Sequence, residues 1–246
     1  MLKYCNIQSF IRIGKLAHSI RLKGDKHLSY YVRLMSKEDV AQVTEIDREA
    51  FPTQLPPPNY QRELQNRLAH YIVVCDKEKT IDTPEVKAPA EENSTGLASK
   101  WRRLFNLNRF FNNDQPPPSG HHICGFVGFW VMADEAHITS IAVREVERRR
   151  GLGELLLISA IDLATKLKAD IMTLEVRASN SDAQSLYSKY SFIETGVRTG
   201  YYTDNREDAL VMSTRDISSV AFQTSLQQLK QVHSRKWGVA LYQIAR

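Results

Sequence analysis

The chain has 246 residues, of which 42% are hydrophobic and 25% are charged, as in ordinary soluble globular proteins. No run of about 18 apolar residues occurs, so we expect no transmembrane helix. Cys5, Cys75 and Cys124 are far apart and form no CxxC pair. This usage predicts neither a disulfide framework nor a zinc site, and it fits a reducing compartment. We therefore expect a cytoplasmic protein without a metal.

The net charge of +5 comes from one end of the chain. Residues 1–29 contain six Lys or Arg residues and one Asp, whereas the basic and acidic groups of the remaining residues cancel. We therefore expect no DNA-binding face on the domain. Residues 1–29 are interpreted as a flexible basic extension, since their fit to an organelle transit peptide is loose.

The first ordered pattern predicts two strands and two helices. Residues 31–34 resemble a strand, and Ser36 ahead of two acidic residues is a typical helix start. Apolar residues at helical spacing continue to Phe51, and Pro52 with the later Pro56–Pro58 run ends the helix. The next predicted elements are a helix over 60–68 and a strand over 71–75.

Residues 76–121 interrupt this pattern. They begin with a polar stretch rich in Pro, Glu, Thr and Ser and end in a Pro-rich run, which predicts a low-order insertion. Within them, residues 93–114 combine Trp101 with several Phe and Arg residues. This basic amphipathic patch could make weak contact with a membrane or a ribosome. The alternative is a helix that folds back on the domain or stays flexible.

The second half of the chain alternates strands and helices, which is typical of an α/β (α+β) domain. We place that domain at residues 30–215, followed by a C-terminal helical tail over 216–246. The predicted elements are strands over 123–131, 137–143, 171–176, 192–198 and 209–214, and helices over 151–168 and 181–190.

Three arginines and two glycines lie between an apolar strand and an apolar helix, in the order Arg148-Arg149-Arg150-Gly151-Leu152-Gly153. A helix N-terminus offers free N–H groups and a partial positive charge. Glycines there let a phosphate approach the backbone closely. The motif therefore suits a pyrophosphate, although it is neither a P-loop nor a GxGxxG turn. A solvated basic turn is the alternative.

Two further motifs carry groups suited to acid–base chemistry and substrate contact. Glu175 ends a strand of buried type and Tyr187 lies on the following helix, so they could act as general base and general acid. The alternative is that Glu175 pairs with an arginine and Tyr187 belongs to the core. Tyr201 and Tyr202 are expected on a hairpin, where they could contact a peptide-like substrate or form an ordinary aromatic turn.

The order and spacing of these motifs resemble the GNAT acetyltransferases, and within them the RimI branch of ribosomal-protein-alanine N-acetyltransferases. The likeness covers residues 137–212 closely and residues 30–75 more weakly. It implies a GNAT fold, with a mixed central sheet of about seven strands flanked by helices in one domain with a long insertion. The matching runs are Ile-Ala-Val at 141–143, Arg-x-x-Gly-x-Gly at 148–153, Leu-Glu-Val-Arg-x-Ser-Asn at 174–180, Leu-Tyr at 186–187 and Tyr-Tyr with Glu-Asp-Ala within 201–209.

The resemblance also implies acetyl-CoA as co-substrate and a role for each matching position. Glu175 would take a proton from the acceptor's α-ammonium, Tyr187 would protonate the leaving thiolate, and Asn180 would contact the pantetheine arm or order the site. Tyr201 and Tyr202 would contact the N-terminal residues of the acceptor. The remaining cofactor contacts would come from Ile141, Ala142 and Val143 at the acetyl and pantetheine portions, and from Arg148, Arg149, Arg150, Gly151, Leu152, Gly153 and Glu154 at the pyrophosphate.

Two positions depart from the family pattern. Gln54-Leu55 replaces a usual Pro-Trp in the segment that shapes the acceptor site. Ser191 replaces a usual Gly, which costs about 1 kcal/mol if the backbone there is left-handed. The leading hypothesis is acetylation of a protein N-terminal α-amine, with a ribosomal protein N-terminal alanine as acceptor. The alternatives are a lysine or small-molecule amine, or a non-catalytic acyl-CoA-binding docking module.

Overall fold

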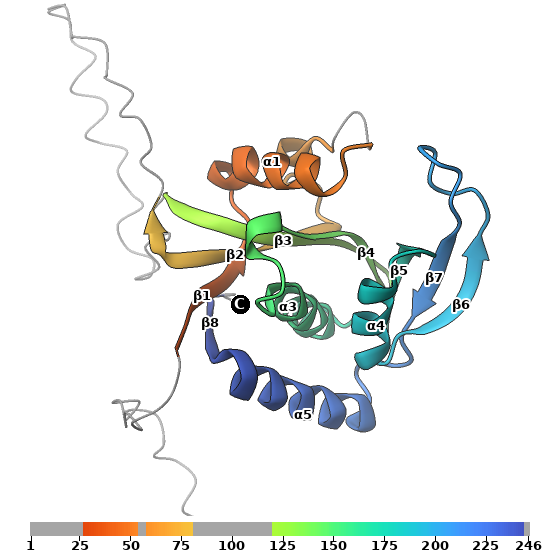
Figure 1. The fold of residues 1–246 in the computed structure, drawn as a ribbon. Coiled ribbons are helices and arrows are strands. Elements are labelled where there is room, and N and C mark those ends of the chain that lie inside the picture. The colour runs from red at the N-terminus through yellow and green to blue at the C-terminus, as the bar shows by residue number, and fades with distance from the viewer. Residues whose placement is uncertain (1–26, 54–57, 81–119, 244–246) are drawn as a thin grey trace, which may run out of the picture.

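A computed structural model describes residues 27–53, 58–80 and 120–243. These residues form an eight-stranded sheet with the strand order β6-β7-β5-β4-β3-β2-β1-β8, and helices cover both faces (Figure 1). The strands are β1 (His27–Leu34), β2 (Ala69–Thr80), β3 (His121–Met132), β4 (Glu135–Val143), β5 (Ile171–Arg177), β6 (Ile193–Arg198), β7 (Ala209–Ser213) and β8 (Val239–Gln243). The helices are α1 (Val40–Ala50), α2 (Tyr60–Glu63), α3 (Leu152–Lys166), α4 (Ser181–Lys189) and α5 (Val220–Trp237), with 3₁₀ turns η1 (Lys37–Asp39) and η3 (Glu145–Glu147).

The sheet is mixed, as predicted. Strands β1 to β4 pair antiparallel in chain order, and β4 pairs with β5 in parallel. Strand β7 then lies antiparallel between β5 and β6. The strands β1 to β7 correspond to the predicted set of about seven, and β8 adds an eighth by pairing in parallel with β1.

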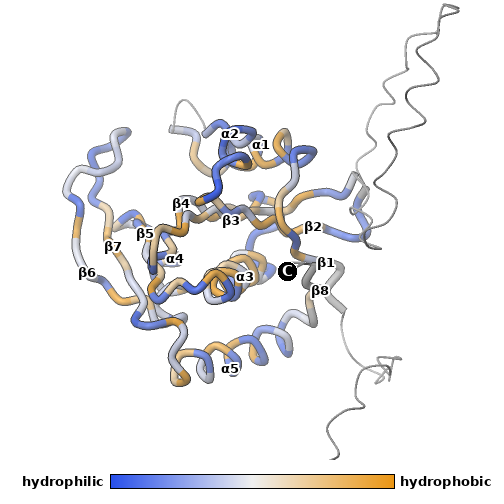
Figure 2. The backbone as a smooth tube through the Cα atoms, turned by 180° about the vertical axis from the view of Figure 1, so that it is seen from behind, coloured by the Kyte–Doolittle hydropathy of each residue, from blue (hydrophilic) through white to orange (hydrophobic). Residues whose placement is uncertain are grey.

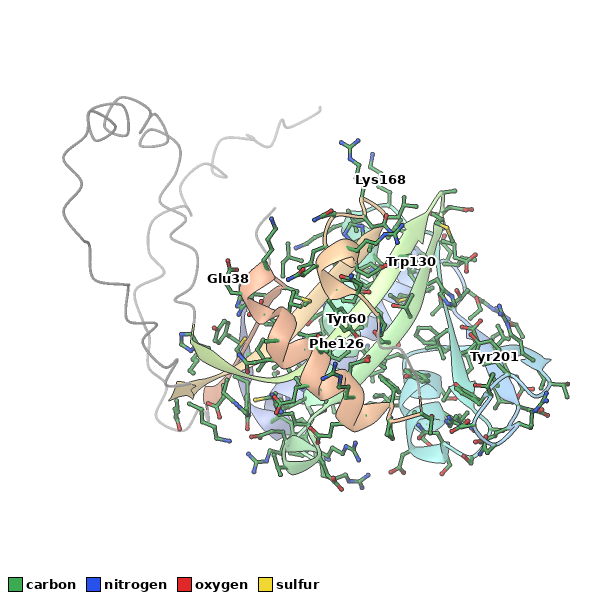
Figure 3. All side chains as sticks on the ribbon, turned by 90° about the horizontal axis from the view of Figure 1, so that it is seen from above. Glu38, Tyr60, Phe126, Trp130, Lys168 and Tyr201 are labelled. Atoms are coloured by element: carbon green, nitrogen blue, oxygen red, sulfur yellow. The ribbon has the colours of Figure 1, made fainter. Side chains whose placement is uncertain are left out.

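Each face of the sheet has its own apolar core. On one face, α1 and α2 pack through residues such as Ile46 and Tyr60, and the Tyr60 ring meets Phe126 of β3 edge-on at 5.7 Å. Figure 3 labels Tyr60 and Phe126 where these helices lie over the sheet. On the other face, α3 is buried along most of its length because ten of its residues are shielded from solvent. The hydrophobic colour of α3 in Figure 2 contrasts with the mixed α5 below it.

The structure corrects four predicted boundaries. Strand β1 begins at His27, inside the predicted extension, and β2 continues to Thr80, inside the predicted insertion. Helix α2 is a single turn because Asn59 caps its start and the chain leaves the helix at Leu64. The predicted helical tail is wrong beyond Trp237, since Gly238 adopts a positive φ of 94° and the chain continues as β8.

Several predictions lie outside the described residues. They include most of the 1–29 extension, Gln54-Leu55, and the 93–114 patch. Within the described part of the chain, no helix combines the length and apolar character needed to cross a bilayer.

Candidate active site

The site lies where β4 and β5 separate. These parallel strands pair from Glu135 with Ile171 as far as Ile138 with Leu174, yet both strands continue beyond that point. The register of β4 against β3 shifts at the same place, leaving Thr139 as an extra residue between the pairs of Ile138 and Ser140. Such a bulge bends a strand and increases its twist. It therefore accounts for the parting, which frees the β5-facing backbone of residues 139–143 from sheet pairing.

A pocket of about 810 Å³ fills this gap. Its walls come from both separated strands, the start of α3, helix α4, the segment that follows α1, and the β6–β7 hairpin. Nine residues singled out from the sequence line this one pocket: Ile141, Ala142, Val143, Gly153, Glu175, Asn180, Tyr187, Tyr201 and Tyr202.

The turn before α3 contains two residues with left-handed backbone. Gly151 is the N-cap residue with a positive φ of 76°, and Arg149 also has a positive φ of 62°. No side chain caps the helix, so the first N–H groups of α3 are available to a ligand. At Gly153 a Cβ atom would meet only a Val143 methyl at 3.9 Å, which leaves an open approach to the backbone.

The charged side chains of this turn are not all directed to the pocket. Arg150 lies 2.9 Å from the buried Glu147 carboxylate, and Arg149 reaches Asp182 in a fully exposed ion pair. The Glu154 carboxylate accepts hydrogen bonds from Lys189 and Tyr190. Of residues 148–154, only Gly153 belongs to the pocket lining, and the Arg150 and Glu154 side chains are engaged in these other contacts.

Glu175 lies in the pocket wall with 10% of its side chain exposed, and both of its oxygens have partners. One oxygen is 3.1 Å from His137 Nε2, and the other is 2.8 Å from Arg198. The alternative of an arginine pairing is thus realised, but with Arg198 and not with the adjacent Arg177. Because the Arg198 side chain is more than half exposed, solvent screening weakens this pair and the carboxylate can exchange it for a ligand.

His137 connects Glu175 to a short polar chain along the paired part of β4 and β5. The Thr173 hydroxyl donates to Glu135 at 2.5 Å, so it can only accept from His137 Nδ1–H, 2.9 Å away. With Nδ1 protonated, the neutral His137 ring accepts a hydrogen bond at Nε2 from a protonated Glu175. The imidazolium form instead donates a hydrogen bond from Nε2 to the Glu175 carboxylate. The geometry lets the His137–Glu175 pair store and pass on one proton.

Tyr187 lies deep in the pocket wall and is only 5% exposed. Burial raises the pKa of its hydroxyl above the ordinary value, so the group carries its proton throughout the neutral range. Among residues of the described ranges, no group pairs with this hydroxyl by a hydrogen bond, which leaves it free for a ligand. The Asn180 side-chain oxygen is already used within the protein, because it caps α4 by accepting a hydrogen bond from Ala183 N–H at 3.1 Å.

The far side of the pocket is an acidic and aromatic hairpin. Arg177 stacks on the Tyr202 ring at 3.8 Å and pairs with Asp204 and Glu207. Hydrogen bonding from Ser179 lowers the pKa of Glu207 to about 2, so it stays charged. Tyr201 lies at the outer end of the hairpin (Figure 3).

A separate buried cluster offers metal-ligand atoms. His122, Cys124 and Glu147 each place one such atom within 4.8 Å of the others. Burial raises the pKa of Cys124 to about 12, so the thiol is protonated. Glu147 already pairs with Lys79 and Arg150. Its charge is therefore compensated by protein cations, and the cluster is explained as structural support beneath the basic turn.

Sequence reasoning missed three residues of the site. His137 and Thr173 face each other only because β4 and β5 pair in that register, and Arg198 reaches Glu175 from another strand. A histidine in the strand that leads to Ile-Ala-Val was the one signal that local sequence offered. The other two positions required the tertiary fold.

The comparisons with known proteins agree with this geometry. The model of the Acetyltransferase (GNAT) family matches residues 88–192. A putative ribosomal protein bS18-alanine N-acetyltransferase of Bacillus subtilis is 32% identical over 182 residues, which cover 74% of this chain and 92% of the relative. The chain therefore belongs to the GNAT acetyltransferase family. It is an N-acetyltransferase, and its curated relatives include enzymes of the RimI branch.

Two further matches place it within that family. The ribosomal protein bS18-alanine N-acetyltransferase of Escherichia coli K12 is 45% identical over 139 residues, or 54% of this chain and 93% of the relative. The crystal structure of the ribosomal-protein-S18-alanine N-acetyltransferase from Escherichia coli aligns with a TM-score of 0.51 at 23% identity, covering 76% of this chain and 94% of that one. This structural match confirms the GNAT fold.

Proposed function

We propose that this enzyme transfers the acetyl group of acetyl-CoA to the N-terminal α-amine of a protein, with the N-terminal alanine of a ribosomal protein as acceptor. The observation that carries the proposal is one pocket that joins the uncapped start of α3 to the Tyr201-Tyr202 hairpin, with Glu175 and Tyr187 in its walls. The names of the Bacillus and Escherichia relatives support the acceptor.

The residues present fit acetyl-CoA, which supplies the acetyl group as an activated thioester. The β4 backbone of Ile141, Ala142 and Val143 is free to pair with the amide groups of the pantetheine arm, as a strand would. The N–H groups at Leu152, Gly153 and Glu154 suit the pyrophosphate. Arg148 and Arg149 add positive charge there, and Arg150 contributes its backbone.

The chemistry needs a base and an acid on the two sides of the reacting carbonyl. Glu175 takes a proton from the acceptor's α-ammonium, and His137 can then accept this proton from Glu175. As the amine nitrogen bonds to the acetyl carbon and the C–S bond breaks, the Tyr187 hydroxyl donates its proton to the departing sulfur. The nitrogen then loses its second proton to become the amide, and this proton restores the Tyr187 hydroxyl. Each transfer of this kind contributes a rate factor of about 10² to 10⁴, and alignment of the amine supplies much of the rest.

The acceptor end is shaped by two segments that are far apart in sequence. Thr53, after α1, donates a hydrogen bond to Asp204 of the hairpin at 3.0 Å, and both residues line the pocket. Asp204 and Glu207 carry two negative charges against the one positive charge of Arg177, so a net attraction for a positively charged amine remains. Tyr201 and Tyr202 offer rings and hydroxyls to the residues that follow the amine. This arrangement favours an extended peptide over a compact amine.

Substitutions test the catalytic roles. We expect Glu175→Gln and Tyr187→Phe each to lower kcat by about 10²-fold or more, with the Kd of acetyl-CoA changed by less than about threefold. Glu194→Gln, on the exposed edge strand β6, is the matched control. Unchanged turnover in Glu175→Gln would remove this residue from the base role.

A substrate panel tests the acceptor. Acetyl-CoA is incubated with Ala-starting ribosomal N-terminal peptides, the same peptides with a blocked N-terminus, free lysine and a polyamine, and thiol release is followed. We expect activity on the unblocked peptides alone. Activity confined to lysine or the polyamine would replace the N-terminal acceptor by a small-molecule amine.

A further inference from the structure

The C-terminal segment, formed by α5 and β8, lies against α3 at the end where the proposed pyrophosphate turn begins. Figure 1 shows α5 running beneath α3, with β8 returning to the outer edge of β1. Two residues of α5 reach the turn: His233, which is 5% exposed, and Trp237. None of the motifs from which we inferred the cofactor site includes this segment.

His233 fixes the direction of one peptide group in the turn. The Gly151 carbonyl accepts the first helical hydrogen bond from Leu155 N–H at 3.0 Å, and His233 Nε2 lies 3.0 Å from the same oxygen. A carbonyl oxygen cannot donate, so His233 contributes the N–H. Because the peptide unit is planar and trans, fixing this carbonyl also fixes Leu152 N–H, which points the opposite way, out of the helix start.

Trp237 closes the turn from the side. A Cβ atom on Gly151 would lie 2.7 Å from both Cδ1 and Nε1 of the indole, so the ring packs directly over the glycine. Gly151 is therefore required twice, by its positive φ of 76° and by this contact. The Trp237 indole thereby holds Gly151 in the left-handed conformation in which the N–H groups at the start of α3 are presented.

The segment itself is held at several points. Lys230 pairs with Asp162 of α3 at 2.5 Å, and Leu226 is buried in the core. Beyond Gly238, β8 pairs with β1 from Val239 onward. Helix α5 is thus fixed to both α3 and the sheet, so its two contacts with the turn have little freedom.

We propose that His233 and Trp237 are positioning residues for acetyl-CoA, through which the C-terminal segment sets the affinity for the pyrophosphate-bearing half of the co-substrate. The proposal rests on the proposed function, since it takes the turn at 148–153 as the pyrophosphate site. It predicts an effect that depends on whether the acetyl donor contains a pyrophosphate.

The test compares two donors, acetyl-CoA and S-acetyl-pantetheine, which lacks the pyrophosphate and nucleotide. We expect His233→Leu and Trp237→Ala each to raise the KM for acetyl-CoA about tenfold, with kcat and the KM for S-acetyl-pantetheine within about twofold of wild type. His233→Gln, which retains an N–H at the position of Nε2, should restore most of the affinity. Val232→Ala, at a half-exposed position of α5, is the control.

The outcomes distinguish the positioning role of His233 and Trp237 from the proposed function. An unchanged KM for acetyl-CoA in both His233→Leu and Trp237→Ala overturns the positioning role while the proposed function stands. An equal rise in KM for both donors also overturns it, because it indicates a general loss of structure. Wild-type protein that binds no CoA in calorimetry overturns the proposed function and the positioning role together.

Discussion

Replacement of Gly153 by alanine separates stability from cofactor binding at the start of α3. Gly153 is helical, and a Cβ atom there would meet only Val143 Cγ2 at 3.9 Å, an ordinary contact. Alanine in place of glycine inside a helix stabilises it by about 0.5–1 kcal/mol. For a domain of this size that corresponds to a rise in Tm of roughly 1–4 °C.

The same methyl group projects into the pocket that Gly153 lines. A phosphate oxygen bound to the backbone must come within about 2.9 Å of an N–H group, and the methyl obstructs that approach. We expect Gly153→Ala to weaken CoA binding at least tenfold, about 1.4 kcal/mol, in a protein that melts at a higher temperature.

Calorimetric titration with CoA and a thermal melt measure both quantities on one sample. Gly196→Ala is the matched control, because a Cβ atom there meets nothing within 4 Å and the position does not line the pocket. A Gly153→Ala protein with raised Tm and wild-type CoA affinity would refute the placement of the pyrophosphate at this turn.

Three further substitutions test the fold by thermal or denaturant unfolding. Ser191 has a positive φ of 66°, so Ser191→Gly should stabilise the protein by about 1 kcal/mol; no gain would mean that the serine is unstrained. Phe126→Ala removes a fully buried ring and should cost about 3–5 kcal/mol, a larger loss than Val232→Ala at a half-exposed site. Arg33→Met leaves the buried Asp39 carboxylate without its partner and should cost about 3–5 kcal/mol, whereas a neutral result would show that water replaces the guanidinium.

Local sequence was sufficient for the elements that build the cofactor side. The Ile-Ala-Val strand, the glycine turn and the apolar helix α3 each carry their own composition or periodicity, whereas the left-handed conformation of Gly151 is known only from the structure. For Ser191, the family resemblance raised a left-handed backbone only as a condition, and the structure meets it with a φ of 66°. The proposed roles of the pocket residues stay predictions until they are measured.

What the sequence did not reveal depends on pairing between distant segments. The bulge at Thr139 is visible only in the register of β4 against β3, because no residue type marks it. The partners of Glu175 come from β4 and β6. Strand β8 is short and directly follows a helix. Its pairing with β1 depends on contacts between residues far apart in sequence, which helical periodicity cannot indicate.

The pairing of β8 with β1 also has a consequence for how the chain acquires its structure during synthesis. Val239 pairs with His27, so more than two hundred residues separate the partners. The outer edge of β1 must therefore stay unpaired until β8 has been synthesised and has left the ribosome, and contacts of such long range form slowly. Until then that edge presents unpaired backbone groups, and the turn before α3 lacks both His233 and Trp237. If His233 and Trp237 position the turn as proposed, a nascent chain gains its full affinity for CoA only once α5 has left the ribosome and folded against α3.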